Sequence, residues 1–164
     1  MRIQTTLMGV ALAALIHAGV APPVSAAPVP VPAVAQGVIR VQSAYGFDET
    51  VARIKADVAA KGIRFFDEID QSQLAAGADI SLRPSKLLLF GNPPLGVQFL
   101  TANPYAGLDW PVRMLVVQDP DGKVWVAWTD FGWMAKRYDI TDRDAAFAMA
   151  ATVSASIAGS TTSR

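Results

Sequence analysis

Two acidic residues, Glu68 and Asp70, stand two positions apart in a β-rich run and form the pair best placed for chemistry. Alternate side chains of a strand point to the same face, so the two Cα atoms would lie roughly 6.5 to 7 Å apart. Such a pair can share a cation or divide acid and base roles. The plainer alternative is a solvated strand end at which Asp70 caps a following helical turn.

The residues that support most nucleophilic and metal chemistry are missing. The one histidine, His17, lies in a segment that we expect to be removed, and the sequence has no cysteine. These absences exclude Ser-His-Asp and Cys-His nucleophile systems, imidazole and thiolate zinc sites, and dithiol redox chemistry. We therefore predict no cofactor and no metal, and only a hard ion such as calcium or magnesium would suit Glu68 and Asp70.

Basic and turn residues near the acidic pair complete a candidate ligand site. Arg83 and Lys86 could bind a carboxylate or phosphate, or could form ordinary surface ion pairs. Asn92 either helps to present backbone amides to an anion or simply caps the helix that starts at Pro93. We predict a ligand groove between the strand end and the turn, formed by Glu68, Asp70, Gln71, Arg83, Lys86, Gly91 and Asn92.

Aromatic residues are dense in a short span of the chain. They could line a pocket for a sugar or a hydrophobic ligand, or they could serve core and dimer packing. The residues concerned are Trp110, Trp125, Trp128, Phe131 and Trp133.

The start of the chain has the three zones of an export signal. Arg2 supplies the positive charge, residues 7–20 are mostly apolar, and small residues end at Ala26. The apolar run is shorter than the roughly 20 residues of a membrane-spanning helix. We expect a periplasmic or secreted protein with a signal peptide over 1–26, a Pro/Ala/Val-rich leader over 27–37, one domain over 38–158 and a disordered tail over 159–164.

Charge gives no sign of a nucleic-acid partner. Signal removal takes Arg2 from the 14 basic residues and leaves the 14 acidic residues in slight excess. A nucleic-acid-binding surface needs a basic patch, so we predict neither nucleic-acid binding nor membrane association after cleavage.

The periodicity of the remaining chain predicts an α+β domain of order β-α-β-β-α-β-β-α, with a mainly antiparallel sheet and helices on one face. Apolar residues at Phe47, Val51, Ile54 and Val58 indicate a helix that Gly62 stops. The other predicted elements are strands at 38–42, 63–70 and 86–90, a helical turn or two at 71–78, and helices at 93–102, at 131–138 and after Thr141.

The most secure tertiary prediction is a hairpin. Residues 113–118 and 123–129 are β-rich and flank the turn sequence Asp119-Pro120-Asp121-Gly122. The second strand is apolar on both faces, and burial of both faces would need a second subunit. We therefore expect a homodimer.

Four motifs in this sequence resemble the bacterial domain of unknown function 302 family over roughly 38–138. The resemblance implies a compact α+β fold of the TATA-binding-protein-like class and a dimer, and the family has no established activity. The sequence departs from the family at Gln71, where histidine is usual, and at Val97, where threonine is usual. The motifs are Tyr45-Gly46-Phe47-Asp48-Glu49-Thr50, Glu68-Ile69-Asp70, Leu82-Arg83-Pro84 and Phe90-Gly91-Asn92-Pro93.

We interpret the sequence as an exported, non-catalytic, dimeric module that binds a small ligand or another envelope protein. An alternative is a hydrolase or lyase that uses Glu68 and Asp70, which requires a carboxyl of raised pKa in a concave pocket. A second alternative is a structural dimer without a ligand.

Overall fold

The computed structural model describes residues 35–163. The predicted signal peptide and residues 27–34 of the predicted leader lie outside the described residues. The elements in chain order are β1 (Val38–Gln42), α1 (Phe47–Ala60), β2 (Arg64–Asp70), α2 (Gln71–Ala76), β3 (Ser85–Gly91), α3 (Pro93–Ala102), the 3₁₀ helix η1 (Pro104–Leu108), β4 (Val112–Gln118), β5 (Val124–Thr129), α4 (Phe131–Arg137) and α5 (Asp144–Gly159).

The strands form one sheet in the order β1-β5-β4-β3-β2, with every neighbouring pair antiparallel. This confirms the predicted α+β class and antiparallel sheet. The predicted β4-β5 hairpin is present, and its turn ends at Gly122 with a φ of +80°, a backbone conformation that costs glycine little. Gly62 ends α1 in the same left-handed region, with a φ of +63°.

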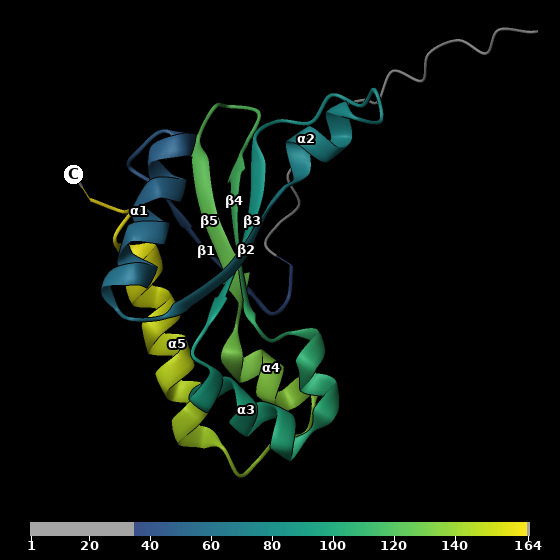
Figure 1. Ribbon diagram of the computed structural model, residues 1–164, viewed down its shortest axis with the longest axis vertical. Helices are drawn as coiled ribbons and strands as arrows, with labels where there is room; N and C mark the ends of the chain where they lie inside the picture. The colour runs from purple at the N-terminus through teal and green to yellow at the C-terminus, as the bar shows by residue number, and fades with distance from the viewer. Residues whose placement is uncertain (1–34, 164) are drawn as a thin grey trace, which may run out of the picture. The chain divides into compact units, whose positions relative to one another are not determined.

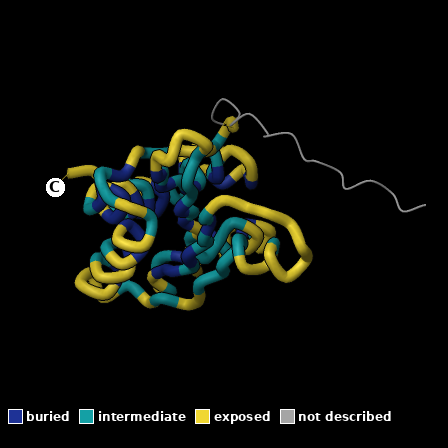
Figure 2. Tube along the Cα trace, turned by 90° about the horizontal axis from the view of Figure 1, so that it is seen from above, coloured by how far each residue is buried: buried dark blue, intermediate teal, exposed yellow. Residues whose placement is uncertain are grey.

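Helices α1 and α5 lie side by side on one face of the sheet (Figure 1). Alternate strand residues meet them in the core, among them Leu88, Phe90 and Val126, and α1 contributes Ile54. The burial-coloured trace shows the buried segments gathered inside, with exposed chain on the outside (Figure 2). None of the helices in residues 35–163 is long and apolar enough to cross a bilayer.

The opposite face of the sheet is also apolar. Leu87 pairs with Leu115, and Val117 pairs with Trp125, and all four side chains are half-buried. They alternate with the core residues of the same strands and therefore point away from α1 and α5.

The predicted disordered tail is wrong for its described part. Thr161 is fully buried, and its carbonyl accepts the Ala44 N–H at 2.8 Å and the Ser43 hydroxyl at 3.2 Å. The segment around Thr161 therefore packs on the loop between β1 and α1. The helix predicted after Thr141 is present as α5, which begins at Asp144 with Arg143 in the N-cap position.

Candidate functional site

The structure does not bring the seven predicted ligand residues together. Because β2 and β3 are antiparallel, Asp70 pairs with Lys86 at one end of the ladder and Arg64 pairs with Gly91 at the other. Glu68 and Gln71 therefore lie at the Asp70 end. Asn92 lies with Gly91 at the far end, and Arg83 is exposed in the loop before β3. The predicted groove between the strand end and the turn is not formed.

At the Asp70 end, ammonium groups already pair with the carboxylates. Lys86 Nζ donates to Glu68 Oε1 at 2.7 Å and lies 3.6 Å from Asp70 Oδ2. Lys55 Nζ of α1 donates to Glu68 Oε2 at 2.9 Å. Lys86 thus occupies the position between the two carboxylates that a shared cation would take.

Hydrogen bonds also satisfy the other polar groups of this cluster. Asp70 accepts the Ser72 hydroxyl at 2.6 Å and the Gln73 N–H at 2.9 Å, so it caps α2, as the plainer interpretation predicted. Gln71 accepts the Ser85 hydroxyl at 2.7 Å.

These bonds set the protonation behaviour of the acidic pair. The hydrogen bond from Lys86, helped by that from Lys55, lowers the pKa of Glu68, and the Ser72 hydroxyl lowers the pKa of Asp70. A general acid would need a raised pKa and a concave surrounding. The observed arrangement favours carboxylates that are ionised at neutral pH and have a structural role.

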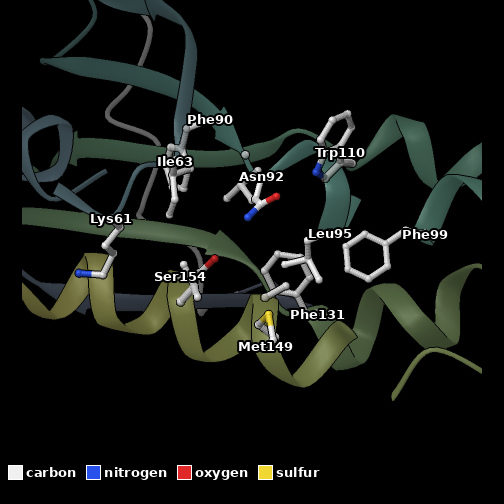
Figure 3. Close-up of a pocket in the computed structure, with 14 residues that line it drawn as sticks. Lys61, Ile63, Phe90, Asn92, Leu95, Phe99, Trp110, Phe131, Met149 and Ser154 are labelled. Atoms are coloured by element: carbon white, nitrogen blue, oxygen red, sulfur yellow. The ribbon is translucent and has the colours of Figure 1, made fainter. Parts of the chain in front are cut away.

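At the far end, a pocket of about 290 Å³ opens between the end of β3, α3 and α5 (Figure 3). Its walls are mainly aliphatic and aromatic, and its polar side chains are Lys61, Asn92 and Ser154. The remaining lining residues are Ile63, Phe90, Gly91, Leu95, Phe99, Trp110, Val112, Phe131, Met149, Ala150 and Val153.

Two prolines explain why Asn92 faces this pocket. A capping side chain accepts from the second or third helical N–H. Here Pro94 has no N–H, and the Leu95 N–H bonds to the Asn92 main-chain oxygen at 3.1 Å. Asn92 makes no side-chain cap, contrary to the capping alternative, and its amide points to the pocket (Figure 3).

Trp110 forms the wall opposite α5 and packs directly against glycine backbone. A Cβ at Gly96 would lie 1.9 Å from Trp110 Cε2, and one at Gly91 would lie 3.3 Å from the indole nitrogen. The Phe66 ring meets Trp110 edge-on, with centroids 6.1 Å apart. Only a residue without a side chain fits at Gly96.

Asp109 holds the segment that carries Trp110. Its carboxylate accepts the Tyr138 hydroxyl at 2.6 Å and Arg113 Nη2 at 2.7 Å, and Arg137 lies 3.3 Å away. Burial acts to raise the pKa of Asp109, but the hydrogen bonds from Tyr138 and Arg113 outweigh it, and the pKa is lowered. The segment is thereby fixed to β4 and to the end of α4.

The α5 wall of the pocket was missed by the sequence analysis. Met149 and Val153 are one helical turn apart and flank the buried positions Ala150 and Ser154. Met149 has 58% of its surface exposed, which is high for an apolar side chain. Apolar residues at Met149 and Val153, next to the buried positions of α5, were the sequence signal that could have predicted this wall.

The predicted aromatic cluster is divided by the sheet. Trp110 and Phe131 line the pocket, whereas Trp128 is buried in the core and Trp125 lies on the opposite face. Trp133 lies against Gly37. The aromatic residues are therefore divided between the pocket wall, the core and the opposite sheet face.

The fold and pocket define a single α+β domain with an antiparallel five-stranded sheet and an apolar pocket at one end. The chain belongs to the family described as "Domain of unknown function DUF302", which matches residues 39–158. It is similar to the crystal structure of an uncharacterized conserved DUF302 protein from Bacillus stearothermophilus, with a TM-score of 0.70 and 16% identity over 77% of this chain and 99% of that one. That likeness shows the fold.

Two relatives are described as fluoride-specific ion channels. The chain is 34% identical over 104 residues to fluoride-specific ion channel FluC 1 of Brucella suis, a match covering 63% of this chain and 41% of that protein. FluC 2 of Brucella melitensis is also 34% identical, with 63% and 38% covered. The chain thus spans about two fifths of the length of these relatives.

Proposed function

We propose that this protein is an exported, non-catalytic binding module whose pocket beside Trp110 holds a small, mainly apolar molecule. The observation that carries the proposal is the 290 Å³ pocket with aromatic walls. Phe90, Phe99 and Phe131 line it and are buried, so the pocket reaches the core.

The size of the pocket supports a ligand rather than a packing defect. Protein interiors are close-packed, and voids larger than a water molecule are few. An apolar cavity of about 150 Å³ is enough to bind benzene. The pocket in this protein is nearly twice that size and is open to solvent beside Lys61 and Asn92.

Toluene is a suitable first probe because it has no polar atom and is smaller than the pocket. We expect it to bind in calorimetric titration and to raise the midpoint of thermal unfolding. The Val153→Phe variant should fill the pocket and lower toluene affinity by about tenfold or more, whereas Thr152→Phe, on the exposed side of α5, should bind as the wild type does. Absence of toluene binding would reject the proposal and favour the structural-dimer alternative.

Export is part of the proposal and has its own test. The chain starts with the three zones of a signal peptide. N-terminal analysis of the protein from the periplasm or the medium should therefore find Ala27 as the first residue. A retained Met1 in the cytoplasm would contradict export.

We also propose that the protein is a homodimer joined through the open sheet face. Leu87, Leu115, Val117 and Trp125 would supply an apolar contact that a monomer leaves half-exposed. Light scattering after gel filtration should report two chains, and Leu115→Glu should report one. A single chain for the wild type would contradict the dimer.

A second candidate function is docking on a membrane protein, in line with an envelope-protein partner. The match to fluoride-specific channels over less than half of their length favours it. A purified channel trimmed of its matched region should then retain this protein when the protein is added separately. Lack of retention would remove this candidate and leave small-molecule binding untouched.

A further inference from the structure

The pocket contains polar groups that no protein group uses. Within residues 35–163, no hydrogen bond joins the Trp110 indole N–H, the Asn92 amide or the Ser154 hydroxyl to another group of the protein. The indole nitrogen is on the ring edge turned toward Asn92 and Leu95 (Figure 3). Ser154 is buried, with only 1% of its surface exposed.

From these groups we infer that the pocket selects an amphipathic molecule with an apolar body and an oxygen-bearing, acidic head, of the medium-chain monocarboxylate class. The inference rests on the proposed function and specifies its ligand. The Trp110 N–H and the Asn92 NH₂ are donors, and the Ser154 hydroxyl can donate as well. A carboxylate offers several acceptor sites to such a set.

The charges around the pocket favour an acid over an amine. Lys61 is charged, and none of the fourteen lining residues is acidic. The Lys61 ammonium pairs with Asp57 at 2.6 Å on the outer surface of α1, and its alkyl stem contributes to the mouth. An ammonium head would find only the uncharged side-chain acceptors Asn92 Oδ1 and Ser154 Oγ, and no carboxylate among the lining residues to balance its charge.

The volume indicates the length of the apolar body. At the roughly 30 Å³ that a water molecule occupies in the liquid, 290 Å³ corresponds to about ten non-hydrogen atoms. Octanoate has about that number, and its chain would lie against Phe90, Phe99 and Phe131. Octanoate is therefore the probe of choice, and octylammonium is its matched counterpart of opposite charge.

The test compares three probes by calorimetric titration at neutral pH. Octanoate should bind the wild-type protein about tenfold or more tightly than octylammonium does. Trp110→Phe keeps an aromatic wall but removes the N–H, and Ser154→Ala removes the hydroxyl. Each should weaken octanoate about tenfold more than it weakens toluene, as expected for the loss of a hydrogen bond to a charged group, because toluene has no polar atom. Trp125→Phe, on the opposite face, is the matched control and should change neither.

The outcomes separate this inference from the proposed function. If toluene binds but octanoate and octylammonium bind equally, or if both variants bind octanoate as the wild type does, the head-group inference is overturned and the apolar pocket stands. If neither toluene nor octanoate binds, both proposals fail. Retained unfolding midpoints of the ligand-free variants show that a loss of affinity is not a loss of fold.

Discussion

The two ends of the β2-β3 pair differ in how their polar groups are used. At the Asp70 end, Glu68 and Lys86 are of reactive types, but each is paired within the protein. At the Gly91 end, the side chains of Asn92 and Ser154 face an apolar pocket and have no hydrogen-bond partner within residues 35–163. Polar side chains without a protein partner beside a cavity point to a ligand more directly than residue type does.

Adding a side chain at Gly96 should disturb the pocket end of the β2-β3 pair more than any other change proposed below. Because a Cβ there would lie 1.9 Å from the Trp110 ring, we expect Gly96→Ala to move the indole, lower the free energy of unfolding by about 1–3 kcal/mol and abolish toluene binding. Denaturant unfolding and calorimetric titration measure the two effects. Gly159→Ala is the control, since its Cβ meets no atom within 4 Å. Equal stability of the two variants would show that Trp110 does not pack as described.

Two buried hydroxyls, one hydrogen-bonded and one without a partner within residues 35–163, test the difference between paired and unpaired polar groups. The Thr50 hydroxyl shares a 2.7 Å hydrogen bond with Ser43 and donates to the Gly46 carbonyl at 2.8 Å, whereas the Ser154 hydroxyl has no partner among the described residues. Thr50→Val should therefore lower the free energy of unfolding by about 1–2 kcal/mol, and Ser154→Ala by less than about 0.5 kcal/mol. Denaturant titration of both checks this. A larger loss for Ser154→Ala would mean that its hydroxyl supports the fold.

The Asp70 end of the β2-β3 pair should affect the stability of the protein at acid pH without affecting the pocket. The folded-state pKa values of Glu68 and Asp70 are lowered, so their contribution to stability is present above their unfolded values, near pH 4, and is lost as the pH falls through the folded values. In the Lys86→Met variant, the midpoint of thermal unfolding should fall less between about pH 5 and pH 2 than it does in the wild type. Toluene binding should be unchanged. An unchanged pH profile would show that Lys86 does not lower the pKa of Glu68.

The sequence predicted the sheet, the hairpin and most helix boundaries because those depend on local periodicity and turn chemistry. The spacing of Phe47, Val51 and Ile54 and the turn ending at Gly122 are examples. The site was predicted less well, because the antiparallel pairing that separates Asp70 from Gly91 involves residues about twenty positions apart.

The pocket itself depends on contacts that are more distant still. Ser154 comes from the last helix, and Trp110 reaches the cavity only because Gly96 leaves room for its ring. The sequence around Ser154 and around Trp110 does not indicate that the two residues line the same pocket. The apolar residues Met149 and Val153 of α5 were the nearest indication of the pocket in the sequence.

The most direct test of the account is a nitrogen-15 correlation spectrum of the protein titrated with toluene. The four tryptophans give separate indole N–H signals, and Trp110→Phe assigns the one of interest. The account predicts that the Trp110 signal moves saturably while that of Trp125, on the opposite face of the sheet, stays in place. A fixed Trp110 signal, or movement of the Trp125 signal in its stead, would contradict the claim that the pocket at the end of β3 is the binding site.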